Sequence, residues 1–156
     1  MRALTGYGGG MPHDSAFGGR ATRTALPVVE PGAADLPLVK RLRLPQGDLA
    51  QLYDADEGIR YLAWLELKAG TLRGNHYHLQ KREYFYLIAG SVDLVLEELA
   101  TGERVEWHLA AGDLVFLEPG IVHAYRPQSD GQAVEFSPQR FAAEDTRRKV
   151  IVAPAG

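Results

Sequence analysis

The chain has 156 residues, of which 46% are hydrophobic and 24% charged, and this composition is typical of one globular domain with its own core. Lysine and arginine total 17 against 20 acidic residues, so the formal net charge is −3 and a nucleic-acid partner is not expected. Because the chain has no cysteine, disulfides, thiolate metal sites and cysteine nucleophiles are excluded. No apolar run approaches the roughly 20 residues of a membrane span, and no signal-peptide core precedes the domain, so we expect a cytoplasmic protein without a membrane partner.

The N-terminal segment is rich in glycine and poor in apolar side chains, which gives it little surface to bury against the entropy of its backbone. We therefore expect a flexible tail over residues 1–24 and a single domain over residues 25–156. The alternative is an arm that docks on a partner subunit through Tyr7 and Phe17.

Beyond residue 36 the pattern is that of an all-β protein. Short apolar runs alternate with turn signals, which favours a sandwich or a barrel. Residues 91–98 and 104–109 alternate apolar and polar side chains with period two, and the Thr-Gly turn between them predicts a hairpin. Only residues 141–149 look helical.

Three histidines and one glutamate are the candidate metal ligands. His76 and His78 stand two residues apart on a predicted strand, so both imidazoles face the same side. Glu83 begins the next strand, and His123 follows a Pro-Gly turn much later in the chain. Three neutral imidazoles and a carboxylate suit a divalent transition metal (Mn, Fe, Co, Ni, Cu or Zn) and do not choose among these ions. Four protein ligands leave room on the metal for water or substrate.

These residues fall into two motifs, and with them the sequence resembles the cupin family. The first motif has glycine, His-x-His, glutamate and glycine at the family spacing, and the second has glycine, Pro-x-Gly with its proline replaced, and histidine. The matching residues are Gly70, His76, His78, Glu83 and Gly90 in the first motif, and Gly112, Gly120 and His123 in the second. Glu118 replaces the second motif's first proline and Pro127 its asparagine, and both changes lie away from the ligands.

The resemblance implies a double-stranded β-helix, or jelly-roll, barrel with a metal held by the four ligands. It also implies a metal-dependent enzyme acting on a small oxygen-bearing molecule, of the dioxygenase or isomerase type. Residues 73–78 are similar to cupins that isomerise or epimerise sugar nucleotides, although the epimerase acid–base set is not recognisable. A non-catalytic cupin that binds a metal or small ligand is the other alternative.

Two further side chains are candidate catalytic groups. Tyr125 shares the strand phase of His123, and Glu135 lies on a strand whose inward phase the sequence leaves open. Phe85 shares the phase of Glu83 and should line the barrel interior, whereas His108 falls on a polar phase and should be solvated. Residues 79–82 should form a solvated turn, and Arg73 and Asn75 should face away from His76 unless Gly74 forms a bulge.

We also expect a homodimer. Small cupins usually pair, and the two apolar strands predicted within residues 37–54 could cover the sheet edge of a partner.

Overall fold

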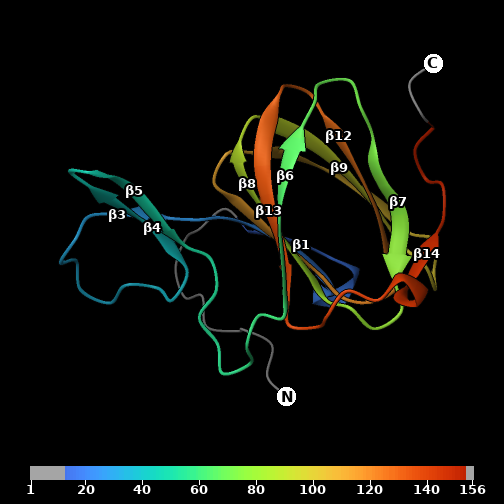
Figure 1. The fold of residues 1–156 in the computed structure, drawn as a ribbon, viewed down its shortest axis with the longest axis horizontal. Helices are drawn as coiled ribbons and strands as arrows, with labels where there is room; N and C mark the ends of the chain where they lie inside the picture. Colours follow the sequence, from blue (N-terminus) through green and yellow to red (C-terminus); the bar gives the residue numbers. More distant parts are fainter. Residues whose placement is uncertain (1–12, 154–156) are drawn as a thin grey trace.

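Two antiparallel sheets face each other in the computed structural model, which describes residues 13–153 (Figure 1). The larger sheet has the order β1-β2-β11-β8-β13-β6 and the smaller one β10-β9-β12-β7-β14. The strands of the larger sheet are β1 (His13–Ala16), β2 (Ala21–Ala25), β6 (Tyr61–Leu67), β8 (Glu83–Ala89), β11 (Asp113–Leu117) and β13 (Gly131–Ser137). Those of the smaller sheet are β7 (Arg73–His78), β9 (Ser91–Glu98), β10 (Arg104–Ala110), β12 (Ile121–Pro127) and β14 (Thr146–Arg148). This arrangement confirms the predicted all-β jelly roll.

Period-two alternation divides the apolar side chains between two clusters. One cluster fills the barrel interior, where Leu94 and Leu96 of β9 meet Phe85 and Leu87 of β8. The other covers the outer face of the larger sheet and includes Tyr84 and Phe136, whose rings stack 4.9 Å apart. The predicted hairpin is confirmed, because β9 pairs with β10 through a turn that contains Gly102 at φ +74°.

A third, small sheet stands to one side of the barrel (Figure 1). It consists of β3 (Val28–Val29), β4 (Lys40–Leu44) and β5 (Gly47–Gln51), and β4 pairs with β5 as an antiparallel hairpin. Within residues 13–153 no helix is long and apolar enough to span a bilayer.

The N-terminal boundary differs from the sequence-based expectation. Residues 1–12 lie outside the described part, but residues 13–24 of the expected flexible tail form β1, the 3₁₀ turn η1 (Phe17–Gly19) and most of β2. β2 pairs with β11 along its whole length, while Phe17 and Ala21 pack into the interior cluster. The prediction of a flexible tail is wrong for this segment because long-range pairing with β11 stabilises it, and composition does not report such pairing.

The predicted helix over residues 141–149 is also wrong. This segment contains only the 3₁₀ turn η2 (Ala143–Asp145), followed by β14, which adds to the edge of β7. Tertiary pairing therefore overrides a weak local helical pattern.

Phe17→Ala tests the docking of the N-terminal segment. The side chain is 8% exposed and packs in the core, so its truncation should lower the free energy of unfolding by about 3 kcal/mol. The same substitution at Phe141, which is 63% exposed, is the matched control and should cost under about 0.5 kcal/mol. Denaturant unfolding measures both, and equal small effects would show that residues 13–24 do not dock.

Candidate metal centre

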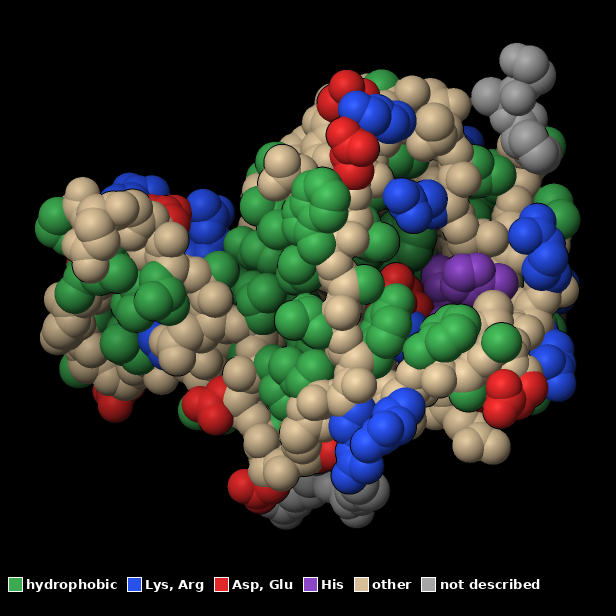
Figure 2. Space-filling model, in the orientation of Figure 1, with side chains coloured by type: hydrophobic (Ala, Val, Ile, Leu, Met, Phe, Trp, Pro, Cys, Tyr) green, Lys and Arg blue, Asp and Glu red, His purple; other side chains and the backbone are tan. Residues whose placement is uncertain are grey.

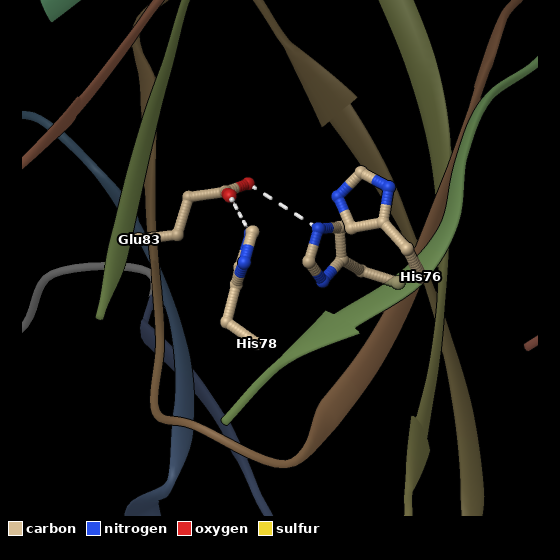
Figure 3. Close-up of side chains that lie close together, drawn as sticks. His76, His78 and Glu83 are labelled. Atoms are coloured by element: carbon tan, nitrogen blue, oxygen red, sulfur yellow. Dashed lines mark hydrogen bonds and ion pairs between the residues drawn. The ribbon is translucent and has the colours of Figure 1, made fainter. Parts of the chain in front are cut away.

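Four side chains from three strands converge at one end of the barrel interior. His76 and His78 come from β7, Glu83 from the start of β8 and His123 from β12, and one potential ligand atom from each lies within 4.8 Å of the others. Figure 3 shows Glu83 pointing across from β8 toward the imidazoles of β7. On the face in Figure 2, histidine side chains lie in a hollow beside acidic and basic groups.

A β-bulge in β7 aims the two histidines. His76 pairs with His123, but Gly74 pairs with Ala124, so β7 holds one extra residue, Asn75. Gly74 and Asn75 adopt φ +93° and +56°, and a Cβ on Gly74 would lie 2.5 Å from the carbonyl oxygen of His123. Only glycine fits this close crossing of β7 and β12. The bulge at Gly74, which the sequence analysis gave as the condition for a different orientation of Arg73 and Asn75, is therefore present.

One imidazole nitrogen of His123 has a lone pair that can bind a metal ion. Its Nδ1 lies 3.0 Å from the carbonyl oxygen of Ile121, which can only accept, so this nitrogen carries the proton. Its Nε2 is buried, and it has no hydrogen-bond partner within residues 13–153. A buried lone pair without a donor is unfavourable, and a metal ion at the centre of the cluster would satisfy it. The residues present therefore fit a divalent ion held by three imidazoles and one carboxylate.

Glu83 is the anion of the site and is 2% exposed. Its Oε2 lies 3.1 Å from His78 Nε2 and 3.3 Å from Lys81 Nζ, and Tyr125 donates to Oε1 at 3.2 Å. Burial alone would raise the pKa of this carboxyl group, but His123, His78 and Lys81 together lower it below its usual range. Glu83 is thus a carboxylate at neutral pH, as metal ligation requires.

His76 and His123 are biased toward the neutral form. Burial is the main cause that lowers the pKa of His76 to about 4, and it also lowers the pKa of His123. A neutral imidazole offers the lone pair that a metal or a proton needs. His76 is also the only half-exposed member of the cluster, so it is the member most open to a substrate.

Both predicted catalytic candidates lie beside this cluster. Tyr125 stacks on Phe85 with ring centroids 4.4 Å apart, and burial raises the pKa of its phenol well above the ordinary value, so it stays protonated. Glu135 faces inward with an 18% exposed side chain and accepts from Lys81 Nζ at 2.6 Å. Burial, followed by the charge of Glu83, raises the pKa of Glu135 to about 7 against the opposing effect of Lys81.

Sequence reasoning missed Lys81. It lies within the turn predicted to be solvated, yet its side chain is 4% exposed and contacts Glu83, Glu135 and the face of the Tyr61 ring. Its sequence neighbours are polar or charged, so nothing in the local sequence distinguishes this buried lysine from an exposed one. Of the other residues considered, Arg73 is exposed and donates to the Glu66 carbonyl, and His108 is solvated beside Asp93, as predicted.

Comparison with known proteins agrees with this architecture. The sequence profile of the cupin domain matches residues 63–137, whereas a search of curated proteins finds no match. The dTDP-4-dehydrorhamnose 3,5-epimerase from Sulfolobus tokodaii is 12% identical with a TM-score of 0.69, covering 88% of this chain and 81% of that one. The Legionella pneumophila dTDP-6-deoxy-D-glucose-3,5-epimerase RmlC, in complex with dTDP-4-keto-L-rhamnose, is 14% identical with a TM-score of 0.67, covering 88% and 76%. The Campylobacter jejuni TDP-quinovose 3,4-ketoisomerase WlaRB is 15% identical with a TM-score of 0.64, covering 72% and 89%.

The profile match, the two motifs and the barrel show that residues 63–137 form a cupin domain. Its jelly roll has the fold of these sugar-nucleotide epimerases. At these identities the structural likeness shows the fold.

The raised pKa of Glu135 makes the stability of the folded protein depend on pH. Between pH 4.5 and 7 the folded state retains a proton on Glu135 that the unfolded chain has released, so this group's contribution to stability is lost as the pH rises. Glu135→Gln removes that loss. From pH 4.5 to pH 8 the variant should therefore gain about 3 kcal/mol relative to the parent in urea unfolding. A variant that instead weakens relative to the parent over this range would show that the Lys81 ion pair outweighs the burial of the carboxylate.

Proposed function

We propose that this protein is an isomerase or epimerase of a keto-sugar nucleotide, and that its His76, His78, Glu83 and His123 cluster holds a divalent metal. The observation that carries the proposal is the placement of two groups beside that cluster inside the barrel: Glu135, which can exchange a proton near neutral pH, and Tyr125, whose hydroxyl can donate a hydrogen bond. Three of the most similar solved structures are described as sugar-nucleotide 3,5-epimerases or a 3,4-ketoisomerase, which supports this reaction class over dioxygenation.

The chemistry of this class is the removal of a proton from the carbon next to a keto group. The C–H electrons form a C=C bond, and the carbonyl oxygen takes the negative charge. Return of the proton to the opposite face inverts that carbon. Its return to the former carbonyl carbon moves the keto group, provided that the hydroxyl on the neighbouring carbon loses its proton and the former carbonyl oxygen gains one. A base with a pKa near the working pH performs such transfers best, and Glu135 meets this requirement.

The other side chains have distinct roles. Tyr125 holds its proton and its O–H can donate to an oxygen that gains charge, in exchange for its contact with Glu83. Lys81 supplies a fixed positive charge next to Glu135. A bound divalent metal would stabilise negative charge on the substrate oxygen.

Deuterium exchange tests the proposed reaction. Incubated with dTDP-4-keto-L-rhamnose in D₂O, the protein should incorporate deuterium next to the keto group, and Glu135→Gln should slow this by about 100-fold or more. Proton NMR of the sugar measures the exchange, and His108→Ala, on the solvated surface, should match the parent. The absence of exchange across a panel of 4-keto and 3-keto sugar nucleotides would contradict the proposed reaction.

Elemental analysis tests the metal. Protein purified without chelators or a nickel column should carry about one divalent ion per chain, since all four ligand positions are filled. His123→Ala should lose most of the metal, and Glu83→Gln should weaken binding less, because an amide oxygen remains while the negative charge is gone. Retention of parental metal content in His123→Ala would remove that residue from the ligand set.

A non-catalytic cupin that binds a metal or small ligand is the second candidate. It is favoured by the fact that Tyr125 and Glu135 already have partners, in Glu83 and Lys81. Metal at one ion per chain without exchange on any keto-sugar, in air or under nitrogen, would favour this function.

We further propose that two copies of the chain pair through the larger sheet. Among the described residues, its last strand, β6, pairs on one side only. This strand exposes Leu62 and Trp64 at 67% and 60%, and the small sheet beside the barrel exposes Leu49. A free edge with apolar side chains is a surface that proteins usually cover. Light scattering should give a dimer for the parent and a monomer for Trp64→Lys, with Leu99→Lys on the β9–β10 turn as control. A parent that stays monomeric at all concentrations would contradict the pairing.

A further inference from the structure

We propose that Asn75 is a positioning residue that clasps a C-terminal strap, residues 145–152, onto the strand carrying His76 and His78, and that the strap thereby sets the geometry of the ligands. The inference rests on the proposed metal site where it concerns metal affinity. The coupling between the strap and β7 does not depend on a bound metal and is measured separately by hydrogen exchange.

Asn75 uses its whole amide group to hold the strap. Its Nδ2 donates to the carbonyl oxygen of Val152 at 2.8 Å, and its Oδ1 accepts from the amides of Ile151 and Val152 at 2.9 and 3.1 Å. Its own carbonyl oxygen accepts from the amide of Lys149 at 2.9 Å. The side chain is 3% exposed, so removing it would leave three backbone groups of the strap without these partners.

The bulge is what makes this clasp available. Asn75 is the extra residue of β7 and adopts φ +56°, which asparagine tolerates better than most residues. In a regular strand its side chain would point to the face opposite His76, as the sequence predicted. Through the bulge, the same residue that re-aims β7 toward the ligand cluster also binds the strap.

The strap contacts the ligand residues at its other end. β14 pairs with β7 so that Thr146 lies opposite His78, and Thr146 Oγ1 is 3.3 Å from His78 Nδ1. The carboxylate of Asp145 accepts from the amides of Gln80 and Lys81 at 2.7 and 3.1 Å, and its carbonyl oxygen accepts from Leu79. Asp145 therefore fixes the turn that joins ligand His78 to ligand Glu83.

Hydrogen bonds to the second nitrogen of a ligating imidazole orient the ring. His123 obtains this contact from Ile121 of its own strand, but His78 obtains it from Thr146 of the strap. β7 would also be the edge of the smaller sheet without β14. Opening of the strap would therefore release the ring of His78 and the turn that leads to Glu83. Loss of such contacts behind the metal ligands typically weakens metal binding 10–100-fold.

The test compares Asn75→Gly with the parent in two measurements. Glycine accepts the positive φ, so the variant removes the side-chain clasp without adding backbone strain. Asn75→Asp keeps the acceptor for Ile151 and Val152 but sets a carboxylate oxygen against the Val152 carbonyl oxygen, so it should also speed exchange and weaken binding. Leu26→Ala, in the cluster outside the larger sheet, is the control for general destabilisation.

The first measurement is amide hydrogen exchange on metal-free protein. In Asn75→Gly the amides of Leu79, Gln80 and Lys81 should exchange at least tenfold faster, while those in the centre of β9 stay protected. The second is Co²⁺ affinity from its ligand-field absorption, which should fall 10–100-fold in Asn75→Gly and remain at the parental value in Leu26→Ala.

Two results would overturn the inference. Protection of these three amides equal to the parent would show that Asn75 does not hold the strap over the turn. Faster exchange with unchanged Co²⁺ affinity would show that the strap does not position the ligands. A parent that binds no Co²⁺ would instead refute the proposed metal site, and the coupling of strap to strand would then be decided by hydrogen exchange alone.

Discussion

A carboxylate charge buried inside the barrel is the constraint on which this structure depends. Glu83 is 2% exposed, and an isolated carboxylate at that depth would be protonated or would destabilise the fold by several kcal/mol. It remains charged because the imidazole of His78, the ammonium of Lys81 and the hydroxyl of Tyr125 contact its oxygens. The interior therefore has a hydrocarbon part, built around Leu94 and Leu96, and a polar part built around this one anion.

The charge of Glu83 affects the pKa values of the titratable groups around it. The negative charge of Glu83 adds to burial in raising the pKa of Glu135, and Lys81 bridges the two carboxyl groups. Burial, followed by the same charge, raises the pKa of the Tyr125 phenol and keeps it protonated. The surroundings that keep Glu83 charged therefore also include the protonated hydroxyl of Tyr125 and the carboxyl group of Glu135, which titrates near neutral pH. Carbonyl enolisation uses this combination of a hydrogen-bond donor and a base.

The sequence predicted the parts of the fold and of the site that depend on local spacing. The His-x-His pair, Glu83 and His123 come together because strand alternation and the glycine turns fix their phase, and Tyr125 follows from the same phase as His123. The sequence could not predict contacts between segments distant in the chain. Phe17 sits in a glycine-rich segment that is stabilised by β11, Lys81 resembles any solvated lysine, and the C-terminal strap is held by a bulge rather than by its own propensity.

The most direct test of the account is diffraction from crystals of the Co²⁺-loaded protein, recorded at the cobalt absorption edge. We expect one strong anomalous peak per chain, within bonding distance of His123 Nε2, of a carboxylate oxygen of Glu83 and of the rings of His76 and His78. A peak at any other position, or a cluster that stays without metal while His123 Nε2 finds a protein or water partner, would contradict it.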